Sequence, residues 1–492
     1  MRILRSVPPI IQEVLSWASP EAVAATLKNC RGTILLRSGL FDASPARYSY
    51  CVTRPFLTFR AFGSCCEIRR ASELPSVQFG NPWQLLDLLL ARYELLDEID
   101  LPFPLGGCFG FWGYGLKNVF DRGHARKALD DLGLPDCQVG FYDSLLVFDH
   151  HLQKVWIIST GLGLDGSRTD AKAQSQLEFW RARLEEAGRG ANEASPPARP
   201  FPVVHEVESS FSRASFVEAV RKALRYIQLG DIYQVNLAQR LAVRSGLHGW
   251  EVFQQLAAVS PAPFAAYLDC GEFQIASSSP ELFLRLSGSH IQSRPIKGTR
   301  PRAMDPTRDA QLTYELQTSP KEMAELVMIT DLLRNDLGRV CEYGSVQVPE
   351  LVRLERYPQV QHLVSTIEGR LQDKVTHLHA LAQCFPGGSV TGAPKSRALE
   401  IIDELEPITR GPYTGCLGYL GFNRESQLSI VIRAAICVKG WNYFHAGAGI
   451  VADSDPEAEY EETLAKAAGF FAALELAKRT GSLEPERKNR PD

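Results

Sequence analysis

Short apolar runs bounded by polar residues or glycine dominate the first part of the chain. Such runs occupy residues 34–37, 144–148 and 155–159, and they predict buried strands. Residues 171–187 have the pattern of a helix instead. Glycine and aromatic residues alternate over residues 106–114, which suits close packing of strands and does not match the GxGxxG phosphate-binding fingerprint. This part is therefore expected to be rich in sheet.

The pattern becomes sharper after residue 202. Ser212 or Ser215 can cap a helix that continues through Gln228 and ends at Gly230. Strand-like runs then alternate mainly with turns, which favours antiparallel sheet, and they occupy residues 234–241, 264–268, 273–277, 282–286 and 441–446.

Helix starts are marked clearly in the same part of the chain. The sequence Ser-Pro-Lys-Glu at 319–322 is a capping box with proline at the first helical position, and it opens a helix to about Leu337. Asp-Pro-Glu at 455–457 opens another helix to about Arg479. The predicted fold class is α+β, with an antiparallel sheet-rich core and helices packed outside it.

Residues 187–202 lack periodicity and are dense in glycine and proline, so they predict a linker. We expect a sheet-rich companion region over residues 1–186 and a larger domain over residues 203–480. Residues 481–492 are polar and predict a flexible tail.

Composition excludes several classes of protein. Of the 492 residues, 45% are apolar and 22% are charged, and the net charge is -4. These proportions are those of a globular protein with a substantial core rather than a disordered one. A protein whose main task is to coat nucleic acid or an anionic membrane usually carries an excess of positive charge, which this chain lacks.

The chain also lacks the signals of secretion and membrane insertion. Its apolar runs are far shorter than the ~20 residues that cross a bilayer, and its start has no apolar segment of a signal peptide. Eleven cysteines are scattered without a CxxC pair, which indicates neither a disulfide framework nor a zinc site. We therefore expect a cytoplasmic protein with reduced thiols.

Two predicted helices carry carboxylates at helical spacing. Glu459, Glu462 and Lys466 share one face of the last helix, and Glu322 and Glu325 share a face of the helix after Pro320. Two such helices facing each other could hold Mg²⁺, which takes one or two carboxylates and completes its shell with water and substrate oxygens. A solvated face with salt bridges is the alternative, and spacing alone favours it.

Three loops could bind a ligand. Residues 387–395 form a glycine-rich loop before a helix, where free N–H groups favour an anion, although the spacing fails the Walker A pattern. Residues 294–302 are strongly basic, and a nucleophilic Lys297 there would need the neutral amine, which burial or neighbouring cations favour. Gly447 and Gly449 would let backbone approach a ligand. A plain turn or solvated loop is the alternative for each.

Taken together, these segments resemble the chorismate-utilising enzymes, a family that includes anthranilate, aminodeoxychorismate, isochorismate and salicylate synthases. The resemblance covers most of the chain after the linker, because the motifs occur in the family's order. They are 230–235 (Gly-Asp-Ile-Tyr-Gln-Val), 279–281 (Ser-Pro-Glu), 295–299, 325–336, 362–365 (His-Leu-Val-Ser), 387–395, 432–433, 447–449 and 462–466. The resemblance implies the family's fold and a single catalytic domain over residues 203–480.

Two positions separate the members of this family. Isochorismate and salicylate synthases have a water-activating lysine where this chain has Gln234, whereas members that use ammonia have glutamine there. Anthranilate synthases have alanine at the position of Lys297, whereas members that aminate C4 have lysine. The resemblance therefore implies amination of chorismate at C4 to 4-amino-4-deoxychorismate, the precursor of 4-aminobenzoate and folate. Anthranilate formation and a non-catalytic, carboxylate-binding regulator remain the alternatives.

The resemblance also implies a role for each site residue. Lys297 would be the nucleophile and Glu281 the general acid, whose raised pKa requires shelter from water. His362 would orient substrate or act as acid and base. Chorismate would contact Gly298, Thr299, Ser389, Tyr413, Arg433, Gly447, Gly449 and Lys466. Glu325 and Glu462 would hold Mg²⁺, with Glu322 and Glu459 nearby or acting through water.

The family implies a partner and leaves regulation open. Ammonia usually comes from a separate glutamine amidotransferase subunit. Cys108 lies between glycines, as in the active-site turn of such a subunit, but no His-x-Glu motif follows it. Members that bind tryptophan carry Leu-Leu-Glu-Ser near the start, whereas this chain has Arg37 in place of the glutamate. Tryptophan binding is therefore not expected.

Overall fold

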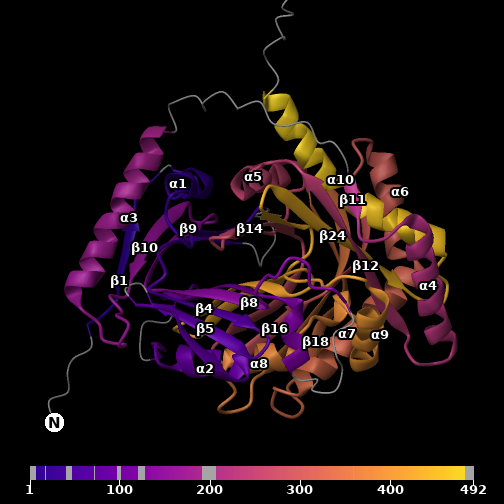
Figure 1. The fold of residues 1–492 in the computed structure, drawn as a ribbon, viewed down its shortest axis with the longest axis horizontal. Coiled ribbons are helices and arrows are strands. Elements are labelled where there is room, and N and C mark those ends of the chain that lie inside the picture. The colour runs from indigo at the N-terminus through magenta and orange to yellow at the C-terminus, as the bar shows by residue number, and fades with distance from the viewer. Residues whose placement is uncertain are drawn as a thin grey trace, which may run out of the picture.

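Two large antiparallel sheets lie one above the other, with helices on their outer faces (Figure 1). The computed structural model describes residues 7–16, 18–39, 47–70, 73–96, 101–119, 128–190, 207–357 and 359–481. Each sheet has twelve strands. The largest cluster of buried apolar side chains draws on strands of both sheets, among them Phe59, Phe111 and Ile275. The predicted α+β class with an antiparallel sheet-rich core is confirmed.

The first sheet joins strands from distant parts of the sequence. Its order is β1 (Ile10–Val14), β10 (Lys154–Ser159), β9 (Ser144–Asp149), β3 (Tyr48–Val52), β2 (Ile34–Arg37), β13 (Phe264–Asp269), β14 (Phe273–Ser279), β23 (Ala434–Val438), β24 (Trp441–Ile450), β12 (Gln234–Arg244) and β11 (Val207–Ser209), with β20 (Gly392–Ala393) also on β12.

The second sheet is built in the same way. Its order is β17 (Ile296–Pro301), β19 (Val360–Arg370), β16 (His290–Arg294), β15 (Leu282–Ser287), β22 (Glu425–Ile430), β21 (Cys416–Gly421), β7 (Gly107–Trp112), β8 (Cys137–Tyr142), β4 (Leu57–Phe62), β5 (Cys65–Arg70) and β6 (Ser76–Phe79), with β18 (Gln347–Arg356) also on β19.

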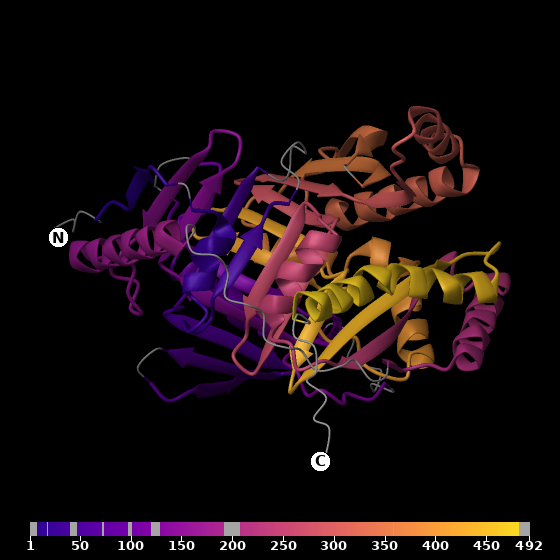
Figure 2. The same ribbon diagram turned by 90° about the horizontal axis from the view of Figure 1, so that it is seen from above.

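Helices cover both sheets. On the outer face of the first sheet lie α1 (Pro20–Thr26), α3 (Asp170–Gly190), α5 (Gly249–Val259) and α10 (Pro456–Gly481), and Figure 2 shows α3 and α10 over opposite ends of that sheet. The other helices are α2 (Pro82–Ala91), α4 (Arg213–Gln228), α6 (Pro306–Gln317), α7 (Pro320–Gly338), α8 (His377–Cys384) and α9 (Lys395–Leu405), with short 3₁₀ turns η2 (Tyr114–Val119) and η3 (Gly388–Val390).

Strands from both sides of the expected linker pair directly with each other. In the first sheet β2 pairs with β13, and in the second sheet β7 pairs with β21. Gly110 of β7 lies opposite Gly418 of β21, and a Cβ atom on Gly110 would lie 2.2 Å from the carbonyl oxygen of Gln138 on β8. The glycine and aromatic alternation of residues 106–114 therefore serves close strand packing, as its pattern indicates. The division of the sequence into residues 1–186 and 203–480 stays a prediction, although strands from both regions belong to both sheets.

The sequence locates most elements closely. Ser212, rather than Ser215, caps α4, because its side chain accepts a hydrogen bond from the Ser215 N–H. Helix α3 continues to Gly190, so the first residues of the expected linker are helical, and residues 191–202 lie outside the described residues. Helix α10 likewise continues to Gly481, and the rest of the expected tail lies outside the described residues.

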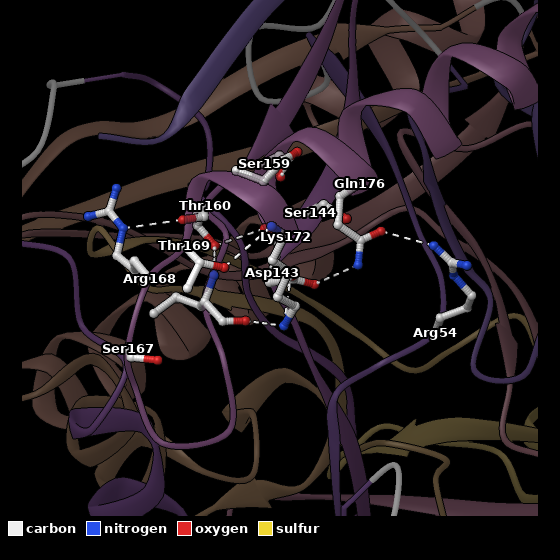
Figure 3. A network of polar contacts seen from close by, with 12 residues as sticks. Arg54, Asp143, Ser144, Ser159, Thr160, Ser167, Arg168, Thr169, Lys172 and Gln176 are labelled. Carbon is white, nitrogen blue, oxygen red and sulfur yellow. Dashed lines mark hydrogen bonds and ion pairs between the residues drawn. The ribbon is translucent and has the colours of Figure 1, made fainter. Parts of the chain in front are cut away.

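A buried polar network attaches α3 to the first sheet (Figure 3). Asp143 follows β8 and is 2% exposed, and burial raises the pKa of its carboxyl although Lys172 of α3 lies 3.2 Å away. Gln176, one turn later on α3, donates to Asp143 and accepts a hydrogen bond from Arg54. A buried carboxylate is stable only when it is paired, so this pair fixes where α3 lies.

Candidate active site

A cavity of about 530 Å³ opens between the two sheets. Its walls come from β12 and β24 of the first sheet, β17 and β19 of the second, and helices α7 and α10. Every site residue predicted from the sequence lines it except Glu459: Glu281, Lys297, Gly298, Thr299, Glu322, Glu325, His362, Ser389, Tyr413, Arg433, Gly447, Gly449, Glu462 and Lys466. The volume suits a small organic molecule.

Glu459 lies apart from the other predicted residues. Its Oε1 atom accepts a hydrogen bond from Ser454 at 2.6 Å, and its Oε2 atom is buried without a partner among the described residues. Burial raises the pKa of this carboxyl, and the neighbouring Glu462 adds to the effect. Glu459 therefore supports the start of α10 from behind the cavity wall.

Glu281 has the properties of a general acid. It follows β14, is 7% exposed, and accepts a hydrogen bond from Ser389 Oγ at 2.6 Å. Burial raises the pKa of Glu281 to about 7, and the Ser389 hydrogen bond and the charge of Lys297 limit the rise. A carboxyl with this pKa is partly protonated near neutral pH, so it can give a proton to a leaving group.

Lys297 extends into the same cavity from β17. Its Nζ atom lies 3.6 Å from Glu325 of α7, and both side chains are 15% exposed. The neighbouring cations are engaged elsewhere, since Arg300 pairs with Glu322 at 3.2 Å and Arg294 with Glu355 at 2.5 Å. Lys297 is thus a sheltered amine with one carboxylate beside it.

Glycine at position 298 lets β17 pass close to α6 and α7. Gly298 has a φ of +67°, and a Cβ atom there would lie 2.6 Å from Leu316 and 3.1 Å from Glu322 Oε2. The predicted capping box at the start of α7 is only half formed. Ser319 accepts from the Glu322 N–H at 3.4 Å, but the Glu322 carboxylate turns to Arg300 instead of the helix start.

His362 is a neutral imidazole in this cavity. Its Nδ1 atom lies 2.9 Å from Thr299 Oγ1, and the Tyr357 ring is 5.8 Å away. Burial lowers the pKa of His362 to about 4. At neutral pH the ring can therefore orient a neighbour or accept a hydrogen bond, and it carries no charge.

Arg433 and Tyr413 form another wall. Arg433 is half-buried with a φ of +53°, a conformation that is sparsely populated for a non-glycine residue and is often found at functional sites. Desolvation lowers the pKa of its guanidinium, which still stays charged at neutral pH. Tyr413 stacks on His445, with ring centroids 4.9 Å apart. A desolvated guanidinium on the cavity wall suits a carboxylate ligand.

Two carboxamides fill the space that Gly447 and Gly449 leave open. A Cβ atom on Gly447 would lie 2.6 Å from Asn236 Oδ1, and one on Gly449 would lie 2.6 Å from Gln234 Nε2. The side-chain oxygens of Asn236 and Gln234 are buried and accept no hydrogen bond from the described residues. These glycines are therefore required for the amides to reach the cavity side of β24.

The cavity is rich in carboxylates that are already paired. Glu462 lies 2.6 Å from Lys466, which also donates to the Gly447 carbonyl. Within the described ranges, no three His, Cys, Asp or Glu side chains are gathered so that they could hold a metal ion by themselves. Oxygen donors on α7 and α10 do fit Mg²⁺, provided that water and a ligand complete its shell.

Lys395, at the end of the glycine-rich loop 387–395, has a structural role rather than the anion-binding role that its charge suggests. Lys395 is 2.5 Å from Asp336 of α7 and also donates to the carbonyls of Cys384 and Pro386. This buried ion pair holds the loop in place. Ser389, in the middle of the loop, is the residue that lines the cavity.

Several cavity residues carry no signal in the sequence. Lys321 follows the capping serine, and Asn236, Phe444 and His445 belong to strands whose alternation indicates only which face each residue occupies. The three strand residues lie at the cavity because β12 pairs with β24. Local pattern does not encode that pairing.

The N-terminal half contains two residues that the sequence analysis singled out, Cys108 and Arg37. Cys108 is completely buried in β7, and burial raises the pKa of its thiol well above the ordinary value, so it is no nucleophile. Arg37 forms an ion pair with Glu21 of α1. All eleven cysteines lie among the described residues as free thiols, as expected. No helix in the described part of the chain is long and apolar enough to cross a membrane.

Comparison with known proteins agrees with this geometry. Residues 44–472 match the model of a protein family described as chorismate binding enzyme. Aminodeoxychorismate synthase component 1 of Salmonella typhimurium is 43% identical over 94% of this chain and 97% of its own length. Anthranilate synthase component 1 of Thermus thermophilus is 43% identical over 81% of this chain and 85% of its own length. The crystal structure of anthranilate synthase component I from Streptococcus pneumoniae has a TM-score of 0.76 at 29% identity, covering 87% of this chain and 93% of that one. The chain therefore belongs to the family of chorismate binding enzymes.

Proposed function

We propose that the protein is the chorismate-aminating component of an aminodeoxychorismate synthase, which converts chorismate and ammonia to 4-amino-4-deoxychorismate. The observation that carries the proposal is the placement of Lys297 in one cavity with Glu281, an acid whose pKa is about 7. Relatives named aminodeoxychorismate synthase component 1 support it, including that of Escherichia coli, 38% identical over 95% of this chain.

The two residues would divide the reaction into two displacements. The Lys297 amine adds to C2 of chorismate, the ring double bonds shift, and the C4 hydroxyl leaves as water with a proton from Glu281. Ammonia then forms a bond to C4 while the bond from C2 to Lys297 breaks. C4 is trigonal in the covalent intermediate, so addition of ammonia to the face that the hydroxyl left gives retention at C4, and each displacement has a lower barrier than a direct one.

Binding of the substrate would draw on the remaining cations and oxygen donors. Arg433 suits one carboxylate of chorismate, with Tyr413 and the backbone at Gly447 and Gly449 beside it. Ser389 holds Glu281 in place. His362 is neutral, and it would orient the substrate from its place on β19 in the cavity wall.

Magnesium belongs to this proposal as the expected cofactor. Glu325 and Glu462 line the cavity and would hold Mg²⁺, with Glu322 on the same cavity wall. When bound, the ion would neutralise a carboxylate of chorismate. Glu325 would then contact both the Mg²⁺ ion and Lys297, which lies beside it.

A glutamine amidotransferase subunit is the partner we propose, because the relatives are named as first components of two-part enzymes. A cytoplasmic location follows for such a biosynthetic enzyme. Its product would serve the formation of 4-aminobenzoate and folate.

Anthranilate formation is the second candidate, and the relative from Thermus thermophilus is the observation that favours it. Incubation with chorismate, Mg²⁺ and ammonium separates the two. We expect a product that an added lyase converts to 4-aminobenzoate, whereas release of fluorescent anthranilate would refute the proposal. A non-catalytic regulator would consume no chorismate. Lys297→Ala should abolish product formation, with Lys374→Ala, an exposed residue between β19 and α8 that does not line the cavity, as the matched control.

A further inference from the structure

A second, smaller cavity adjoins the active site. It has a volume of about 40 Å³ and lies between η2 and the segment 402–412 that precedes β21. His445 of β24 lines both this cavity and the active-site cavity. The Tyr413 ring, which stacks on His445, completes the wall on the active-site side.

Two polar atoms in the wall of the smaller cavity have no partner among the described residues. They are the hydroxyl of Tyr114, a residue that is 4% exposed, and Nε2 of His445, a residue that is 5% exposed. A buried polar group without a hydrogen bond costs free energy, so such atoms indicate a ligand or ordered water.

The hydrogen-bonding character of both atoms is defined. His445 bonds to the backbone of Thr409, and the Thr409 N–H already donates to Leu129, so the carbonyl accepts from the ring and Nε2 is left as a bare acceptor. Burial lowers the pKa of His445 far below the ordinary value and raises that of Tyr114, so both groups are neutral. The cavity therefore offers one O–H donor and one nitrogen acceptor.

Two cations of the cavity wall lie against the Tyr114 ring. Lys117 Nζ and the Arg410 guanidinium lie 5.0 and 4.9 Å from the centroid of the Tyr114 ring. Each cation has an acidic partner that also lines the cavity, Asp403 for Lys117 and Glu406 for Arg410. The Tyr114 ring thus lies beside two cations that are themselves paired, and its hydroxyl is left to bond a ligand.

Size and polarity together select the class of ligand. About 40 Å³ admits a molecule the size of water and excludes chorismate. The ligand must accept one hydrogen bond and donate another, so it carries both a lone pair and an N–H or O–H group.

We propose that the smaller cavity binds ammonia beside the active site, with the Tyr114 hydroxyl donating to its lone pair and His445 Nε2 accepting an N–H. This inference rests on the proposed use of ammonia as the second substrate. No proton is transferred and no bond is made there. Tyr114 and His445 are positioning residues, which raise the local concentration of the nucleophile next to chorismate.

Steady-state kinetics with ammonium chloride at fixed pH test the proposal on the full chain. Tyr114→Phe removes only the hydroxyl and lies outside the active-site cavity. We expect the KM for ammonia to rise about five- to tenfold, the effect of one lost hydrogen bond, while the KM for chorismate stays unchanged. Tyr267→Phe, a buried tyrosine of β13 outside both cavities, is the matched control and should change neither constant.

The outcomes are distinguishable from those of the proposed function. An unchanged ammonia KM in Tyr114→Phe, or equal rises for ammonia and chorismate, would overturn the ammonia site. Failure of the wild-type protein to form aminodeoxychorismate would overturn the proposed function instead. If the wild-type product is anthranilate, the ammonia KM of the variant still decides the inference about the smaller cavity.

Discussion

The hydrogen bond from Ser389 to Glu281 offers a direct test of the proposed acid. Its donor and acceptor are 2.6 Å apart, and it opposes the effect of burial that raises the Glu281 pKa to about 7. Ser389→Ala removes it. A hydrogen bond to a charged group contributes about 1.5–3 kcal/mol, and a pKa change of one corresponds to 1.36 kcal/mol. Because the neutral acid retains part of the interaction, we expect the Glu281 pKa to rise by about one.

The direction of the change follows from the role of the acid. The protonated carboxyl is the active form, so the rate falls as the pH rises through its pKa. The alkaline limb of kcat against pH should therefore move up by about one pH value in Ser389→Ala, whatever happens to the absolute rate.

The assay measures product formation from saturating chorismate and ammonia between pH 6 and 9, roughly the range that spans this pKa. Ser293→Ala removes a buried serine that bonds to the Phe283 carbonyl outside the cavity, and it serves as the matched control. An alkaline limb that stays in place, or moves to lower pH, would refute the assignment of Glu281 as the acid.

Three further changes have definite expected outcomes. Gly447→Ala places a Cβ atom 2.6 Å from Asn236 Oδ1, so the KM for chorismate should rise at least about tenfold in steady-state assays while the unfolding midpoint changes little. Lys395→Met leaves Asp336 buried without its cation and should lower the free energy of unfolding in urea by about 3–5 kcal/mol. Glu325→Gln should weaken Mg²⁺ activation of chorismate consumption, and an unaltered magnesium titration would count against Glu325 as a ligand.

The sequence locates most residues of the cavity because their motifs are local. Glu281 follows Ser-Pro, and Lys297 lies in a short basic segment, which forms strand β17 rather than the expected loop, so each can be located without knowing what it contacts. Helix starts are equally local, and Ser212 and Ser319 cap the helices as predicted.

Glu459 shows where periodicity is insufficient. Three residues along a helix turn the side chain by about 300°, so Glu459 and Glu462 diverge by about 60° rather than coincide. Ser454 then binds the Glu459 carboxylate at the start of α10. Only the packing of the helix against its neighbours decides which of the two carboxylates faces the cavity.

Residues whose position depends on long-range strand pairing could not be predicted. Asn236 lies opposite Gly449 only because β12 pairs with β24 in this register, and His445 lies opposite Arg240 for the same reason. Likewise no local pattern pairs Gly110 with Gly418. Alternation fixes the face of a strand but leaves its neighbour unspecified.

The pairing of β2 with β13 and of β7 with β21 has a consequence for how the protein is made. A ribosome releases the N-terminal half first, and that half holds β2 and β7 before their partners exist. Each is then an open strand edge, a template on which another nascent chain can pair. The second sheet closes only after Cys416–Gly421 has emerged. Folding yield in the cell should therefore depend on chaperones that shield these edges until translation is nearly complete.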